Sequence, residues 1–146
     1  GMTHSMAHKV GAEFHVVHGL ACGILLPHVI MYNGQVPSKL AVWPKYNHYC
    51  ADKKYQEIAQ LLGLPAKTPE EGVRSLAKAC DDLGKEVGLE MNFKAYGIDE
   101  KEWNKHLDRI AMLAYEDQCS PANPRVPMVE DMKVILKQAY KGFELK

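Results

Sequence analysis

The sequence has no excess of charge of either sign, because its 18 lysines and arginines balance 18 aspartates and glutamates. It also has no tract of basic residues interleaved with aromatic ones. Proteins that bind nucleic acid or anionic membranes usually carry such basic patches. We therefore expect neither nucleic acid nor a membrane as a partner of this chain.

Long apolar runs and secretion signals are missing as well. The longest apolar stretch, residues 19–31, contains Pro27 and His28 and is shorter than the roughly 20 residues of a membrane-spanning helix. The first residues do not follow the basic, apolar and small-residue order of a signal peptide. The four cysteines are scattered without a CxxC pair, which predicts reduced, buried thiols. These absences favour the cytoplasm.

Several catalytic motifs are also absent. The sequence contains no Gly-x-Ser-x-Gly turn, no P-loop and no Gly-x-Gly-x-x-Gly turn, so a serine hydrolase or a nucleotide cradle has no support in it. It has no His-Glu-x-x-His motif either, and a metalloprotease would lack its general base.

The patterns that are present are helical. A length of 146 residues fits one domain with a real core, and strand patterns are nearly absent. We predict an all-α fold with five or six helices and a single helical domain over residues 1–146. The helices are expected at 3–13 and 19–32, from an Asp52 N-cap to a stop at Gly63, from Thr68 to Gly88, from Asp99, and from Met128.

Two segments are expected to depart from regular helix. Pro27 lies inside the helix at 19–32 and should kink or interrupt it. Residues 34–51 contain glycine and two prolines and are predicted to be irregular.

Histidines are concentrated near the N-terminus, where four of the seven lie in residues 4–18. His4 and His8 are four residues apart, so a helix presents both imidazoles on one face. His18 precedes a glycine at a point where the chain can turn back toward that face. Neutral imidazole is a common ligand of zinc and iron. Taken alone, the pair fits a metal site about as well as a surface or capping role.

Two separated blocks of this sequence resemble one family. The first is GMTHSMAHKVG at residues 1–11, which continues to His18-Gly19, and the second is DQCSPANPR at residues 117–125. Both resemble the iron-containing (group III) alcohol dehydrogenases, most of all the alcohol dehydrogenase half of bifunctional aldehyde–alcohol dehydrogenases. The segment LLPHV at residues 25–29 fits as well, so the resemblance covers nearly the whole chain.

The resemblance implies a fold and a site. The fold would be the C-terminal helical, metal-binding domain of that family, which is dehydroquinate synthase-like, and it would be incomplete at its N-terminus. His4 and His18 align with two metal-ligating histidines, and His8 aligns with a catalytic histidine that lines the cleft beside the metal and the nicotinamide. The implied cofactors are Fe(II) or Zn(II) and NAD. An aspartate, a third histidine and the nucleotide-binding domain would precede position 1, and Val17 stands where relatives often have proline.

These implications lead to a main hypothesis and two alternatives. The chain is expected to be the metal-site part of an NAD-dependent enzyme that interconverts primary alcohols and aldehydes, and to be inactive alone. If Met2 is a true start, the chain is instead a free-standing helical metal-binding or assembly module without dehydrogenase activity. A third hypothesis is a zinc module that uses His4, His8 and His18 with Glu13 or water as the fourth ligand.

The same resemblance predicts partners. Helices that would cover residues 19–32 are expected to be partly absent, and exposed apolar area favours self-association. The expected partner is therefore a second copy of the chain, in a homo-oligomer, or a missing N-terminal nucleotide-binding half.

The remaining conspicuous residues are expected to be structural. Asn123-Pro124-Arg125 is interpreted as a turn that leads into the last helix, and Cys119 as a packed thiol. We interpret Trp43 and Trp103 as core or interface residues. The other histidines are expected to be structural or solvated: His15, His28, His48 and His106.

Overall fold

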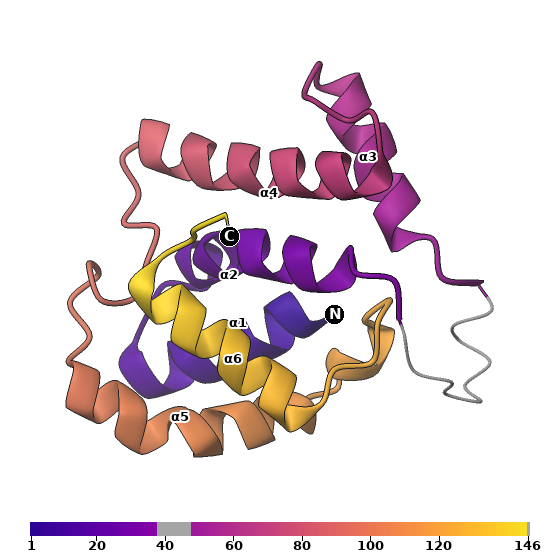
Figure 1. Ribbon diagram of the computed structural model, residues 1–146. Helices are drawn as coiled ribbons and strands as arrows, with labels where there is room; N and C mark the ends of the chain where they lie inside the picture. The colour runs from indigo at the N-terminus through magenta and orange to yellow at the C-terminus, as the bar shows by residue number, and fades with distance from the viewer. Residues whose placement is uncertain (38–47, 146) are drawn as a thin grey trace.

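The computed structural model describes residues 1–37 and 48–145, and within these ranges every regular element is a helix (Figure 1). This confirms the predicted all-α fold. The six α-helices and one short 3-10 turn of the described residues are α1 (Met2–Phe14), α2 (His18–Asn33), α3 (Ala51–Leu61), α4 (Pro69–Glu86), α5 (Glu100–Tyr115), η2 (Ser120–Ala122) and α6 (Val129–Lys141).

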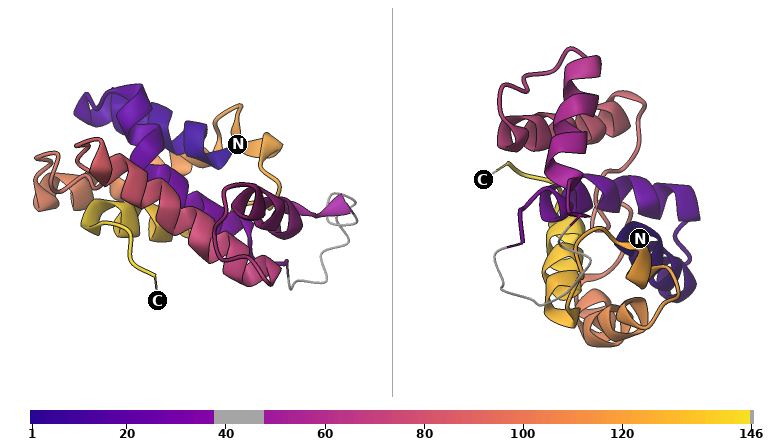
Figure 2. Two further views of the ribbon diagram at one scale, coloured as in Figure 1. Left: turned by 90° about the horizontal axis from the view of Figure 1, so that it is seen from above. Right: turned by 90° about the vertical axis from the view of Figure 1, so that its right-hand side faces the viewer.

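Helix α2 occupies the middle of the molecule. It packs against α4 on one side and against α1 and α6 on the other, and α5 closes the bundle against α1 and α6 (Figures 1 and 2). Helices α3 and α4 pack against each other as a separate pair above α2 (Figure 2). The fold therefore has two helical layers with α2 between them.

The larger core cluster is centred on aromatic rings. Trp103 of α5 is 1% exposed and stacks on Phe14, Phe93 and Tyr140, with ring centroids 5.0–5.4 Å away. Such pairs stabilise a core beyond the area that they bury. This confirms Trp103 as a core residue, whereas Trp43 lies outside the described residues.

Most helix boundaries follow the predicted capping chemistry. The Thr68 hydroxyl accepts the N–H of Glu71 at 3.2 Å, and Asp99 accepts the N–H groups of Lys101 and Glu102. Gly63 and Gly88 follow α3 and α4 with φ of +70° and +79°, the left-handed conformation that ends helices.

The predicted start of α3 is wrong by two residues. Cys50 is its N-cap, and Asp52 lies inside the first turn. A carboxylate is favourable both at the cap and in the first turn, since each position faces the positive end of the helix, so the residue type alone does not fix the boundary.

Two expectations about α2 also need correction. Helix α2 continues through Pro27, so the expected interruption at this residue is wrong, while the expected kink stays a prediction. Ile24, Leu25, Val29 and Ile30 are at most 4% exposed and Leu26 is 40% exposed, so the segment is covered more fully than expected. Helices α1, α4 and α6 bury it. Self-association of the chain thus stays a prediction, but exposed apolar area at residues 19–32 no longer supports it.

Part of the segment predicted to be irregular, 38–47, lies outside the described residues. Within the described part of the chain, no helix has the length and apolarity needed to cross a bilayer.

The turn at residues 123–125 forms hydrogen bonds with both α1 and α2. Asn123 is 1% exposed, and its Oδ1 accepts the N–H of Met2 at 3.2 Å and the amide of Asn33 at 3.3 Å. Its Nδ2 donates to Asn33 Oδ1 at 2.7 Å. Arg125 donates to the carbonyl of Tyr32 and lies over the ring of the same residue. The interpretation of this segment as a structural turn is confirmed.

We predict that Asn123→Ala lowers the free energy of unfolding by about 2–3 kcal/mol, because it leaves buried polar groups of Met2 and Asn33 without partners. Urea denaturation followed by circular dichroism measures this. Asn104→Ala, at an exposed position of α5, is the matched control and should change stability by less than about 0.5 kcal/mol. Equal effects of the two substitutions would contradict the prediction.

Candidate metal centre

Three histidine rings meet where α1 and α2 adjoin. His4 and His8 lie on one face of α1, and His18 is the first residue of α2. The ring of His18 lies 5.3 Å from each of the other two, and those two are 6.1 Å apart, measured between centroids. The structure thus brings together the three residues that the sequence singled out.

The connection between the helices produces this meeting. Helix α1 ends at His15, which has a left-handed φ of 56°, and Val16 is buried at 4% exposure. Val17 then leads into α2 with a φ of −57°. This is close to the angle that a proline ring fixes, so the backbone at Val17 would also suit the proline that the resemblance led us to expect here.

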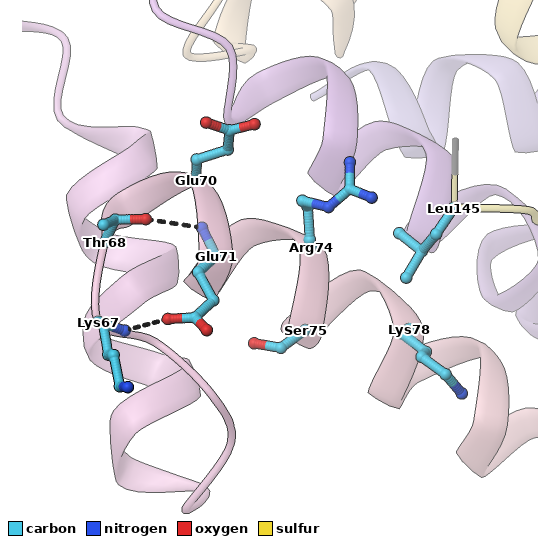
Figure 3. Close-up of a pocket in the computed structure, with 8 residues that line it drawn as sticks. All are labelled: Lys67, Thr68, Glu70, Glu71, Arg74, Ser75, Lys78 and Leu145. Carbon is cyan, nitrogen blue, oxygen red and sulfur yellow. Dashed lines mark hydrogen bonds between the residues drawn. The ribbon is translucent and has the colours of Figure 1, made fainter.

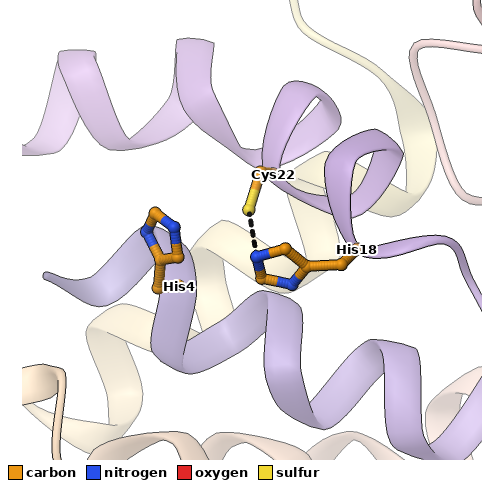
Figure 4. A group of neighbouring side chains, drawn as sticks. All are labelled: His4, His18 and Cys22. Atoms are coloured by element: carbon orange, nitrogen blue, oxygen red, sulfur yellow. Dashed lines mark hydrogen bonds between the residues drawn. The ribbon is translucent and has the colours of Figure 1, made fainter.

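Cys22 belongs to the same cluster, although it was expected to be only a packed thiol. Its Sγ lies 3.5 Å from His18 Nε2, one helical turn away (Figure 4). Metal-ligating atoms of His4, His18 and Cys22 all lie within 4.8 Å of one another. Burial raises the pKa of the Cys22 thiol. The signal in the sequence was the His18-x-x-x-Cys22 spacing, the same as that of His4 and His8.

Asp117 is the acidic residue of the site, and sequence reasoning did not assign it a role. Its side chain is 7% exposed, and Oδ2 lies 3.3 Å from His8 Nδ1 and 2.8 Å from Lys9 Nζ. The hydrogen bond from Lys9, followed by that from the backbone N–H of Cys119, holds the pKa of Asp117 well below its usual range. A carboxylate that stays ionised therefore fixes one side of the His8 ring.

Glu13, in contrast, is not part of the cluster. Its carboxylate lies 2.7 Å from His106 Nδ1 and 2.9 Å from Arg109 Nη1, both on α5. At about 100° per residue, the nine positions from His4 to Glu13 bring it to the opposite face of α1. Glu13 as the fourth ligand of a zinc module is therefore wrong, and a zinc module with water as the fourth ligand stays a prediction.

The other histidines have structural or solvated positions, as expected. His15 ends α1, His106 is paired with Glu13, and His48 is exposed. His28 is 5% exposed, and burial lowers its pKa to about 4, so it stays neutral inside the fold.

A hollow at the start of α4 lies apart from the histidines (Figure 3). Glu71, one of its lining residues, accepts the N–H of Lys67 at 2.6 Å, while its own N–H donates to Thr68. These groups complete the helix cap, and no histidine or cysteine lines the hollow.

Comparison with known families shows to which family this chain belongs. Residues 1–140 match the family described as "Fe-containing alcohol dehydrogenase family, C-terminal". The chain belongs to the iron-containing alcohol dehydrogenase family. The resemblance stated from the two sequence blocks is confirmed.

Several relatives agree with this placement. The chain is 62% identical over 144 residues to an aldehyde-alcohol dehydrogenase of Streptococcus pneumoniae, covering 99% of the chain and 16% of that protein. It is 60% identical over 140 residues to aldehyde-alcohol dehydrogenase 2 of Entamoeba histolytica, covering 96% and 16%. The solved structure of an alcohol dehydrogenase from Oenococcus oeni matches with a TM-score of 0.78 at 25% identity, covering 96% of this chain and 32% of that one. The chain thus spans about a sixth of the length of these two aldehyde-alcohol dehydrogenases.

We predict that Asp117→Asn destabilises the protein by about 1–3 kcal/mol at neutral pH, because it removes a charge that Lys9 and a backbone N–H stabilise. The folded-state pKa is depressed, so this stabilisation is fully present above the unfolded-state pKa of about 4 and is lost as the pH falls through the folded-state value.

Urea denaturation at pH 7 and at about pH 2.5 tests this dependence. The difference between wild type and Asp117→Asn should shrink at the lower pH. Asp82→Asn, which removes an exposed pair with Lys78, should change stability by less than about 0.5 kcal/mol at either pH. A difference for Asp117→Asn that is the same at both pH values would contradict the role of its charge.

Proposed function

We propose that this chain supplies part of the divalent-metal site of an enzyme that interconverts primary alcohols and aldehydes with NAD. The observation that carries the proposal is the meeting of His4, His8 and His18 in a chain of the iron-containing alcohol dehydrogenase family. Two of the relatives bear the name aldehyde-alcohol dehydrogenase.

The residues fit a divalent transition metal. Imidazole nitrogen suits iron and zinc. An ion held tetrahedrally with bonds of about 2.0–2.3 Å keeps its ligand atoms about 3.3–3.8 Å apart. The ligating atoms of His4 and His18 lie within 4.8 Å of each other, so a small movement of an exposed ring brings them to this spacing. His4 and His18 would hold Fe(II) or Zn(II), which when bound makes an alcohol hydroxyl more acidic.

His8 has the surroundings of a proton-transfer group. Its Nδ1 faces Asp117, which leaves Nε2 to accept the proton that a substrate hydroxyl loses. The ionised Asp117 stabilises the positive charge that then forms on the ring. The His8 side chain is 38% exposed, so it can pass the proton to solvent. Positioning of His8 by Asp117 therefore serves the removal of the alcohol proton.

NAD requires residues that the sequence does not provide. The chain has no glycine-rich phosphate-binding turn, and it spans 16% of the length of its aldehyde-alcohol dehydrogenase relatives. We therefore propose that NAD binds mainly to a nucleotide-binding part outside this chain, and that the chain works with that part or as a homo-oligomer.

We predict that His4→Ala and His18→Ala each weaken Zn²⁺ binding by at least about tenfold, because each removes a ligand. His8→Ala should weaken it less than about threefold, since Asp117 rather than the ion faces its Nδ1. Isothermal titration calorimetry measures these affinities. His48→Ala, at an exposed position outside the cluster, is the matched control. Wild-type affinity in both ligand variants, or an equal loss in His8→Ala, would contradict the assignment.

We also predict that the purified chain does not oxidise ethanol or butanol with NAD, even with Fe²⁺ or Zn²⁺ added, because it lacks the nucleotide-binding turn. NADH absorbance measures turnover, and a full-length aldehyde-alcohol dehydrogenase serves as the positive control. Turnover by this chain that His4→Ala abolishes would show that the coenzyme binds here.

A further inference from the structure

Cys22 is the member of the histidine cluster that the proposed mechanism does not use. It lies on α2 one turn after His18, and its side chain points toward the space between His18 and His4 (Figure 4). Cys22 is half-buried, so it is neither a core residue nor fully exposed to solvent.

We propose that the Cys22 thiolate is a third protein ligand, so that His4, His18 and Cys22 together bind Zn²⁺ within this chain. The proposal rests on the proposed function, because it adds to the ligand pair assigned there.

The spacing of the atoms supports this ligand set. Cys22 Sγ and His18 Nε2 are 3.5 Å apart, within the about 3.3–3.8 Å that separates the ligand atoms of a tetrahedral zinc ion. The ligating atom of His4 lies within 4.8 Å of those of His18 and Cys22. A movement of the His4 ring by about 1 Å would bring it to the tetrahedral spacing, and His4 is exposed. Three protein ligands and one open position are the usual set of a catalytic zinc.

The chemistry of sulfur determines which metal the set prefers. Thiolate is a soft ligand that favours zinc over iron when combined with imidazole. On binding, the Cys22 S–H bond breaks, an Sγ–Zn bond forms, and the proton passes to solvent. No electron is transferred, so no oxidant or reductant is needed.

A second group of possible ligands is less suitable. Atoms of His8, Asp117 and Cys119 also lie within 4.8 Å of one another. Lys9 Nζ, however, lies 2.8 Å from Asp117 Oδ2, so a positive charge already occupies that carboxylate. A cation there would have to displace Lys9, whereas no charged group is paired with Cys22 among the interactions of the described residues.

Cobalt(II) replacement and zinc titration test the proposal on the purified chain. Cobalt(II) bound by thiolate gives an intense near-ultraviolet charge-transfer band that imidazole ligands do not give. Wild type should show this band and lose it when Zn²⁺ is added. Cys22→Ser and Cys22→Ala should lack the band and bind Zn²⁺ at least about tenfold more weakly. Cys80→Ser, at another half-buried thiol, is the matched control and should behave as wild type.

A variant that retains only Cys22, with Cys50, Cys80 and Cys119 changed to serine, completes the design and should keep the band. Circular dichroism confirms that each variant is folded. A band that persists in folded Cys22→Ser, or that is absent from wild type, overturns the thiolate ligand. If His4→Ala still weakens zinc binding in that case, the proposed function stands and only this inference fails. If neither His4→Ala nor His18→Ala weakens it, both fail.

Discussion

The burial of α2 between two helical layers is the constraint on which the site depends. It packs against α4 on one side and against α1 and α6 on the other, and Ile24 and Leu25 are almost inaccessible. The first turn, which begins with His18, is more exposed than the buried middle of the helix. A side chain at the end of a rigid, buried helix is held in place without being covered, which suits a metal ligand.

The segment at residues 117–125 fixes the other half of the site. Asp117 contacts His8 and Lys9 in the middle of α1, and Asn123 accepts the first N–H of the same helix. One loop thus sets both the position of α1 and the orientation of the His8 ring. The second block of family resemblance has a physical role here, although none of its residues is proposed as a metal ligand.

The sequence predicted what depends on near neighbours along the chain. The starts of α4 and α5 follow from Thr68 and Asp99, and the shared face of His4 and His8 follows from helical spacing. It did not predict the pairing of His8 with Asp117, which are 109 positions apart and have no local signal. Glu13 was placed at the cluster because it is near in sequence, but helical rotation takes it to α5. The cover of α2 was underestimated because it comes from α1, α4 and α6, whose packing against α2 no local pattern specifies.

The position of the proposed ligands in their helices gives an electrostatic reason for an anionic group at this site. His4 lies in the first turn of α1 and His18 in the first turn of α2. The partial positive charge of a helix N-terminus disfavours a nearby cation by about 0.3–1 kcal/mol. Uncharged imidazole ligands do not offset the partial positive charge of the two helix N-termini, whereas the negative charge of a thiolate ligand does. In the proposed function, the same positive ends would stabilise negative charge that develops on a substrate oxygen, so the arrangement that weakens metal binding would also favour loss of the alcohol proton.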